Sequence, residues 1–195
     1  MTRLVALMLA AAGTVAVAQD TRPTSRPAQG EDVAEPVTSK GGLTFTAQEG
    51  WKQETEQRPM RVVTYVLPKV EGDDEDATVV VYHFPGSGGS VEDNLKRWYG
   101  QWSQPDGKNS ADVAETKKVQ VSGLDATLVD LTGTYTAETR PGSGQRVNKE
   151  GYRMLAAIIE APGGRHFVKC VGPAKTLAKW HDSYRAFLDA IQTDQ

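Results

Sequence analysis

The chain has 195 residues, with 22 Lys and Arg against 25 Asp and Glu, which gives a net charge of -3 at pH 7. A protein that binds nucleic acid through bulk charge needs a basic excess, so this composition argues against that class. The single cysteine excludes an intramolecular disulfide and any zinc or iron–sulfur site built from several cysteines. The hydrophobic share of 38% is ordinary for a soluble globular protein.

The first residues have the pattern of a secretory signal peptide. Arg3 gives a short positive start, an apolar run covers residues 4–12, and the A-x-A triplet at residues 16–18 suits the cleaving peptidase. The apolar run is much shorter than the roughly 20 residues of a membrane span, which argues against an anchor. No cysteine lies near the cleavage point, so a lipoprotein is excluded. We expect a signal peptide over 1–18 and a secreted or periplasmic mature protein.

Residues 19–40 have the composition of a flexible linker. Pro23, Pro27 and Pro36 are spread among small and polar residues. Such a stretch cannot bury enough apolar surface to offset the entropy of ordering it. A spacer is the favoured interpretation, and a sugar-modified or partner-binding tail is the alternative. Residues 41–195 form one predicted domain, which is long enough to fold without a disulfide or a metal.

Strands dominate the first half of this domain. The alternation at residues 43–46 indicates a short strand, and the β-branched runs 60–67 and 77–84 indicate two longer ones. Both faces of 77–84 are largely apolar, which places this strand in the centre of a sheet covered on both sides. The acidic run 71–76 suits the solvated hairpin loop between the two longer strands.

Two amphipathic helices are predicted. Ser90 can cap a helix near residues 90–103, in which apolar side chains recur on one face. A second helix near residues 173–192 begins with a proline, which the first turn tolerates. The side chains of these helices expected in the core are Trp98, Trp102, Trp180, Phe187 and Leu188.

Four further strands are predicted at residues 114–121, 124–135, 152–160 and 165–171. The turn 161–164, Ala-Pro-Gly-Gly, is typical of a hairpin between the last two. The resulting order of elements lacks the regular strand–helix alternation of a doubly wound fold. We therefore predict class α+β, an antiparallel β-sheet with two main helices packed on it.

The sequence Gly-Leu-Thr-Phe at residues 42–45, followed by Gly50-Trp51, resembles the opening of PsbP-like domains. The order of elements over about residues 41–195 is similar to the α/β/α sandwich of that superfamily. Its members include the extrinsic photosystem II subunit, a Ran-binding nuclear import factor and secreted bacterial proteins. Ala47 stands where the family usually has proline, and the metal-associated residues of photosystem relatives match no position here. The resemblance implies a non-catalytic accessory or binding domain.

Two segments are candidates for contacts with a ligand or partner. The glycine-rich turn at residues 86–90 runs from a strand into a helix N-terminus, where backbone N–H groups can bind an anion. Its glycine spacing matches neither the phosphate-binding loop nor the dinucleotide motif. The long segment 136–151 is the second candidate, because long loops are often functional. The residues expected to make contacts are Gly86, Ser87, Gly88, Gly89, Ser90, Arg140 and Arg146. A pocket beside the turn, lined by one of the two arginines, would favour a small ligand.

A metal site would have to use His83, His166 and Cys170. His166 and Cys170 share one face of a predicted strand with Val168, which indicates a buried core and an inert cysteine. The acidic run 71–76 departs from the spacing of a calcium-binding EF-hand loop. The sequence therefore predicts no metal site and no cofactor.

No catalytic motif is found, and neither Ser87 nor Ser143 lies in a G-x-S-x-G pattern. We expect a secreted, non-catalytic accessory domain that binds a protein partner outside the cytoplasm, with no nucleic acid and no membrane span. A small-ligand or anion-binding domain at residues 86–90 is the alternative, and an enzyme without a recognisable motif is the third hypothesis. The partner and the oligomeric state stay open.

Overall fold

The computed structural model describes residues 34–56, 58–86, 88–140 and 142–193. No helix among them is long and apolar enough to span a membrane. The predicted signal peptide, most of the predicted linker and Ser87 lie outside the described residues.

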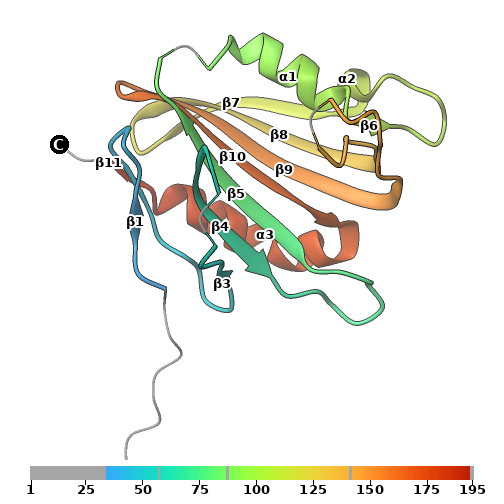
Figure 1. Cartoon of the computed structure of the whole chain (residues 1–195), viewed down its shortest axis with the longest axis horizontal. Helices are drawn as coiled ribbons and strands as arrows, with labels where there is room; N and C mark the ends of the chain where they lie inside the picture. The colour runs from blue at the N-terminus through green and yellow to red at the C-terminus, as the bar shows by residue number, and fades with distance from the viewer. Residues whose placement is uncertain (1–33, 57, 87, 141, 194–195) are drawn as a thin grey trace, which may run out of the picture. The chain divides into compact units, whose positions relative to one another are not determined.

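An eight-stranded antiparallel sheet forms the centre of the fold (Figure 1). In spatial order its strands are β3 (Lys52–Gln53), β4 (Arg61–Leu67), β5 (Ala77–Phe84), β10 (Gly164–Pro173), β9 (Lys149–Ala161), β8 (Leu124–Tyr135) and β6 (Trp102–Ser103), with β7 (Glu115–Val121) also paired to β8. The apolar strand β5 lies in the interior of the sheet, as its sequence predicts. A second, three-stranded sheet joins β1 (Val37–Thr38), β2 (Leu43–Phe45) and β11 (Gln192–Thr193).

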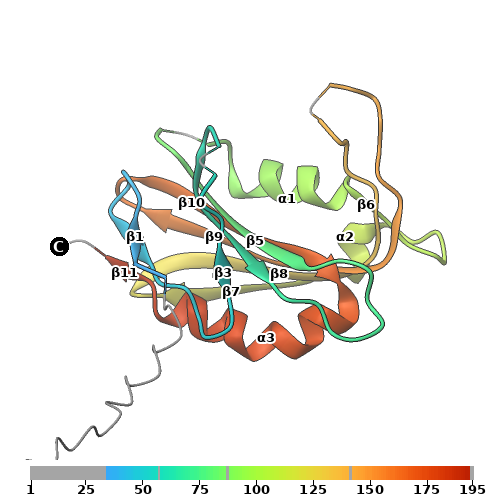
Figure 2. The same ribbon diagram turned by 60° about the horizontal axis from the view of Figure 1, so that its bottom comes forward.

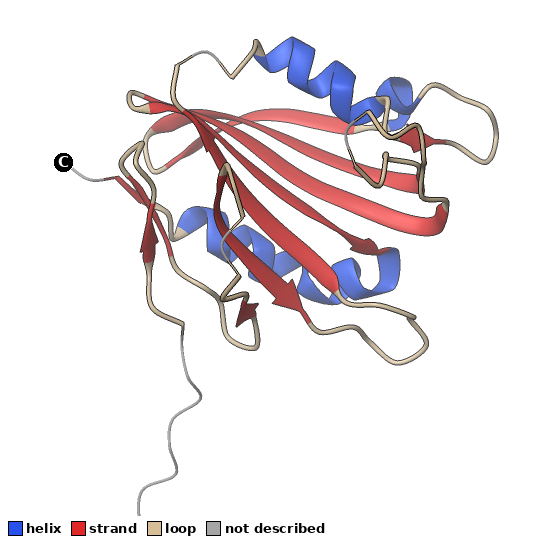
Figure 3. Cartoon of the chain, in the orientation of Figure 1, coloured by secondary structure: helices blue, strands red, loops and turns tan. Residues whose placement is uncertain are grey.

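Two main helices cover the large sheet from opposite sides, as Figure 2 shows. They are α1 (Val91–Tyr99) and α3 (Ala174–Asp189), and a single-turn helix, α2 (Ser110–Val113), follows α1. Coloured by secondary structure, Figure 3 shows the two helical layers and the strand layer between them. The class is α+β, an antiparallel sheet with two main helices packed on it, as predicted from the sequence.

Two boundaries differ from the sequence prediction. The linker was expected to reach Lys40, but Val37 pairs with Phe45 in the small sheet and Ser39 is buried. The folded unit therefore includes the last residues of that predicted segment. The first helix was expected to reach residue 103, but it ends at Tyr99, because the next residues turn away and Trp102 pairs with β8.

The core on the α3 side contains a cluster of aromatic rings around Phe187. The Phe187 ring lies 5.0 Å from that of Trp51, 5.7 Å from that of Tyr65 and 6.1 Å from that of Phe45, measured between centroids. Leu188, Trp98 and Trp102 are also buried, as predicted.

Trp180 is the exception among the side chains expected in the core. It is half-buried at the edge of α3, so the prediction of full burial is wrong. Its Nε1 donates a hydrogen bond to the carbonyl oxygen of Pro68 at 2.9 Å. The ring therefore bridges the helix and the end of β4, and Lys179 Nζ lies 4.5 Å from its centroid.

Candidate functional site

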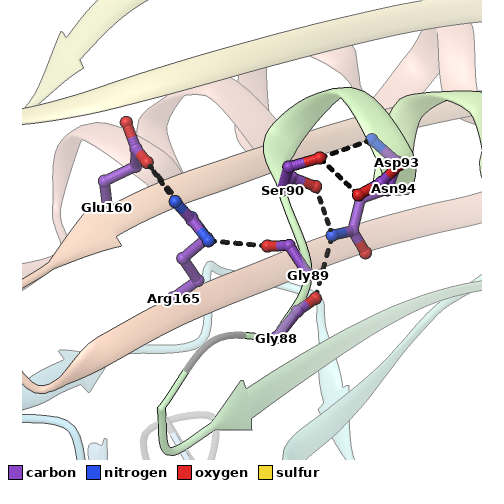
Figure 4. Close-up of polar contacts among 7 residues, drawn as sticks. All are labelled: Gly88, Gly89, Ser90, Asp93, Asn94, Glu160 and Arg165. Carbon is purple, nitrogen blue, oxygen red and sulfur yellow. Dashed lines mark hydrogen bonds and ion pairs between the residues drawn. The ribbon is translucent and has the colours of Figure 1, made fainter.

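The glycine-rich turn between β5 and α1 ends in a capped helix N-terminus, drawn in Figure 4. Ser90 Oγ accepts a hydrogen bond from the backbone N–H of Asp93 at 3.0 Å and donates one to Asp93 Oδ2 at 2.6 Å. These bonds lower the pKa of the Asp93 carboxyl. Together with Glu92, Asp93 puts two carboxylates in the first helical turn, the place where a bound anion would gain from the helix dipole. The arrangement does not favour the anion-binding alternative.

The carbonyl groups of the turn are also occupied. The buried side chain of Asn94 donates through Nδ2 to the carbonyl oxygens of Gly88 and Ser90, at 3.0 and 2.8 Å. Nη1 of Arg165, on β10, donates to the carbonyl oxygen of Gly89 at 2.6 Å (Figure 4). The turn is therefore held by its own helix and by the sheet.

The segment between β8 and β9, which contains Arg140 and Arg146, lies at the other end of the sheet from this turn. Phe84, where the turn begins, pairs with Arg165 at the start of β10, whereas Tyr135 pairs with Lys149 at the start of β9. Since β9 and β10 are antiparallel, these starts are at opposite ends. The pocket that would have favoured a small ligand, between the turn and one of the two arginines, is therefore not formed by the described residues, and Arg165 is the arginine that contacts the turn.

The segment between β8 and β9 forms a hairpin of its own. Thr139 donates its backbone N–H to the carbonyl oxygen of Gln145 at 2.8 Å, and Val147 donates to that of Ala137 at 2.9 Å. Arg146 Nη1 donates to the carbonyl oxygen of Thr136 at 3.2 Å. Arg146 thus fixes the base of the hairpin. A partner contact at Arg140, which is exposed, stays a prediction.

His83 and His166 are stacked on neighbouring strands, with ring centroids 4.6 Å apart. Nδ1 of His166 lies 3.1 Å from the carbonyl oxygen of Gly164, which can only accept, so Nδ1 carries the proton and Nε2 accepts from Ser39 Oγ at 2.6 Å. His83 Nε2 donates in the same way to the carbonyl oxygen of Gly163 at 2.9 Å. Burial lowers the pKa of His166 to about 4, so its ring is neutral near pH 7.

Ser39 and His166 have the side chains of a nucleophile and a base, but a substrate cannot reach them. Ser39 is 6% exposed and His166 is fully buried. Sequence reasoning missed the pair because Ser39 was assigned to the linker. Cys170 lies on the same side of β10 and is also fully buried, which raises the pKa of its thiol. Within the described ranges, no group of three or more His, Cys, Asp or Glu side chains could hold a metal ion.

The acidic loop 71–76 stabilises its surroundings. Asp73 Oδ2 accepts hydrogen bonds from the N–H of Thr176 at 2.9 Å and from its Oγ1 at 2.6 Å, which caps α3 from a distant segment. Glu75 forms an ion pair with Lys149 at 2.5 Å, and Asp76 Oδ1 accepts from the N–H of Lys69 at 2.9 Å. These carboxylates already have partners, so the loop does not have the character of a cation site.

A groove with a largely apolar lining runs beside α1, between the helix and residues 102–111. Its volume is about 670 Å³, within the usual range of ligand sites. Leu95, Tyr99 and Trp102 form its apolar part, and Lys96 also lines it. The helical spacing in the sequence predicts that Leu95 and Trp102 lie on one buried face of a single helix. The sequence therefore shows no sign of a groove between them.

Trp102 lines the groove, and its indole N–H is buried and unpaired within the described ranges. Its side chain is 6% exposed, and its indole Nε1 has no hydrogen-bond partner among the described residues. A buried donor without an acceptor costs about 1–3 kcal/mol. Ser110 connects two residues that line the groove. Its Oγ donates to the carbonyl oxygen of Trp102 at 3.2 Å and accepts from Gln104 Nε2 at 3.1 Å.

No family model matches the sequence, and no curated protein does. Solved structures with similar folds are found. Among them is a PsbP, as the sequence resemblance predicted. This is CyanoP of Synechocystis sp. PCC 6803, which is 12% identical over 87% of this chain and 98% of its own, with a TM-score of 0.49.

Two other similar structures come from bacteria. PA94 of Pseudomonas aeruginosa, described as a protein of unknown function, is 12% identical over 78% of this chain and 92% of its own, with a TM-score of 0.48. LpqN of Mycobacterium tuberculosis, described as involved in cell envelope biogenesis, is 10% identical over 85% of this chain and 87% of its own, with a TM-score of 0.44. These likenesses concern the arrangement of helices and strands alone.

Proposed function

We propose that the chain is an accessory domain that works outside the cytoplasm and binds a protein partner, without a reaction of its own. The observation that carries this proposal is the groove beside α1, with its apolar lining of Leu95, Tyr99 and Trp102. A groove of this kind beside a helix suits a peptide that offers apolar side chains.

The groove favours an extended segment of a protein over a compact small molecule. It is bounded on one side by α1 and on the other by residues 103–111, which run from the end of β6 to the start of α2. Its lining combines Tyr99 and Leu95 with backbone and amide groups, the mixture that polypeptide segments recognise.

The placement of the reactive side chains supports a role without catalysis. The Ser39–His166 pair is inside the core, His83 is hydrogen-bonded to Gly163, and Cys170 is fully buried. A buried thiol also suits a compartment outside the cytoplasm, because oxidants reach it poorly. Cleavage of a signal peptide after residue 18 belongs to the same proposal, and N-terminal sequencing of the native protein should find Gln19 first.

Site-specific photo-crosslinking tests the groove. A photoreactive residue is placed at Ser103, on the exposed wall of the groove, and in a second protein at Ala178, on the exposed side of α3. We expect the Ser103 probe, but not the Ala178 probe, to form one discrete adduct in the native envelope fraction. The adduct is identified by mass spectrometry, and the purified partner is then titrated against the chain.

Matched substitutions decide whether the groove itself is used. Ala111→Trp fills the groove from its rim, whereas Ala178→Trp adds the same side chain on α3. Binding of the purified partner should be lost only in the first variant. Equal adducts at both probe positions, or equal binding by both variants, would contradict the proposal.

A further inference from the structure

The other side of α1 borders a part of the sheet that carries basic and aromatic side chains. Lys169 of β10 pairs with Val80 of β5, and Tyr82, two residues further along β5, pairs with Arg61 of β4. Successive side chains of a strand alternate, so Lys169, Tyr82 and Arg61 point to the same side as α1. Arg97 lies on the exposed surface of α1 next to Lys169. We call Arg61, Tyr82, Arg97, Tyr135 and Lys169 the basic–aromatic face.

Lys169 is the centre of this face and has no carboxylate partner. Its Nζ donates to Gln101 Oε1 and lies 5.8 Å from the ring centroid of Trp98 and 5.7 Å from that of Tyr135. Burial, with Arg97 as the second cause, lowers the pKa of the Lys169 ammonium to about 8. No ion pair to Lys169 is found in the described part of the chain. A half-buried cation beside a second cation is costly without an opposite charge.

The two arginines of the face are held by neutral groups. Nη1 of Arg61 donates to Thr64 Oγ1 at 3.3 Å, and its guanidinium carbon lies 5.9 Å from the ring centroid of Tyr82. Arg97 Nη2 donates to the amide oxygen of Asn94. Both guanidinium groups therefore keep donors for an incoming anion.

Two nearby carboxylates are engaged elsewhere. Asp93, one turn before Arg97 on α1, bonds Ser90 at the helix cap, and Glu56 pairs with Arg58 at 2.8 Å. Glu54 follows β3 beside Thr64, and its Oε2 is buried without a hydrogen-bond partner, but it forms no ion pair with the face within the described residues. The opposite charge that the face lacks is thus not supplied by these neighbours, and an external anion can supply it.

We propose that the basic–aromatic face binds an acidic segment of a partner protein. Arg61 and Lys169 lie on strands that flank β5 and pair with residues two positions apart on it, so their Cα atoms are about 12 Å apart. One carboxylate or phosphate group is too small to contact both, whereas a peptide with several carboxylates can. The half-buried rings of Tyr82 and Tyr135 give the apolar side chains of such a peptide a surface to cover. This contact lies across α1 from the groove and goes beyond the proposed function.

Binding of a designed peptide to the full chain tests the proposal. The probe is a fluorescent peptide in which glutamate alternates with valine, and its control has glutamine in place of glutamate. We expect saturable binding of the glutamate peptide, weakened by added salt, and no binding of the glutamine peptide. Arg61→Gln, Arg97→Gln and Lys169→Met should each weaken binding about tenfold, as expected when one charge-assisted hydrogen bond is lost.

Matched controls lie far from the face. Lys118→Gln on β7 and Arg185→Gln on α3 remove exposed cations from other surfaces and should leave peptide binding unchanged. Ala111→Trp in the groove should also leave it unchanged, which separates this proposal from the proposed function. Arg97 is exposed on α1, so Arg97→Gln tests the face even if Lys169→Met does not fold.

Several results would overturn the proposal. Equal binding of the two peptides, or equal loss in the face variants and the control variants, would show that no specific acidic site exists. Tighter binding of a sulfated polysaccharide than of the glutamate peptide would assign the face to another class of ligand. A dimer in sedimentation that Arg97→Gln converts to monomer would show that a second copy is the occupant.

Discussion

The α3 side and the α1 side of the main sheet differ in how completely a helix covers them. On the α3 side, a helix of 16 residues lies over rings that are almost or fully inaccessible, such as Phe187 and Tyr65. On the α1 side, a helix of 9 residues leaves Tyr82 and Lys169 only partly buried. We propose a division of roles between the two sides. The α3 side stabilises the fold, and the α1 side leaves side chains available for binding. The following predictions test that division.

The largest effect is expected from Phe187→Ala. This substitution removes a fully buried ring from the cluster with Trp51, Tyr65 and Phe45, and such truncations cost about 3–5 kcal/mol. Tyr82→Ala, on the other side of the sheet, should cost about 1 kcal/mol, because its ring is only half-buried. Urea unfolding of both variants measures the two costs. Equal costs would contradict the division between the two sides.

The second effect is a loss of stability in acid that depends on His166. The pKa of its ring is about 4 in the folded chain against 6.5 when unperturbed, so the unfolded chain binds the proton more tightly. The contribution is complete above pH 6.5 and is lost as the pH falls towards 4, by about 3 kcal/mol. His166→Gln should flatten the stability curve between these values, whereas His181→Gln on α3 should not. A curve unchanged by His166→Gln would refute this assignment.

A smaller effect is expected at the cap of α3. Asp73→Ala removes the acceptor of the Thr176 N–H and hydroxyl, so the helix should lose about 1–2 kcal/mol of stabilisation. Asp74→Ala in the same loop is the matched control and should have little effect. Thermal unfolding compares the two, and an equal shift in both would mean that loop charge rather than capping is responsible.

The smallest change in stability, and the sharpest test of the comparison, is Lys169→Met. Replacing a half-buried cation by an apolar side chain of similar length should leave stability unchanged or raise it by about 1 kcal/mol. The same variant is expected to bind the acidic peptide more weakly. A marked loss of stability would show that Lys169 serves the fold, through Gln101 and the rings around it.

Periodicity and turn residues were sufficient to predict most of the large sheet. The central position of β5 followed from its two apolar faces, and α3 from its apolar arc. The two-residue strands β1, β3 and β11 could not be predicted, because their pairing depends on partners brought near by the rest of the fold. Trp102 fits a helical pattern as well as a strand, and only its pairing with Tyr135 decides between them.

The candidate sites were harder to predict than the fold. The turn at residues 86–90 was singled out for its glycines, but the sequence does not reveal that Asn94 and Arg165 occupy its carbonyl groups. The groove and the basic–aromatic face combine residues from separate elements, so no local motif marks them. An unpaired indole N–H or a lysine without a carboxylate is a property of the packed structure, and is found only there.

The small sheet brings β1 and β11 close enough together for the chain to be circularly permuted. Thr38 of β1 and Gln192 of β11 both lie opposite Thr44 of β2, so the two ends of the described fold are about 10 Å apart. A short glycine–serine connector can join them without disturbing either sheet. New ends can then be opened in the exposed hairpin at residues 136–148, at the far end of the molecule. The resulting circular permutant would keep the groove and the basic–aromatic face while leaving both new ends next to each other for surface immobilisation.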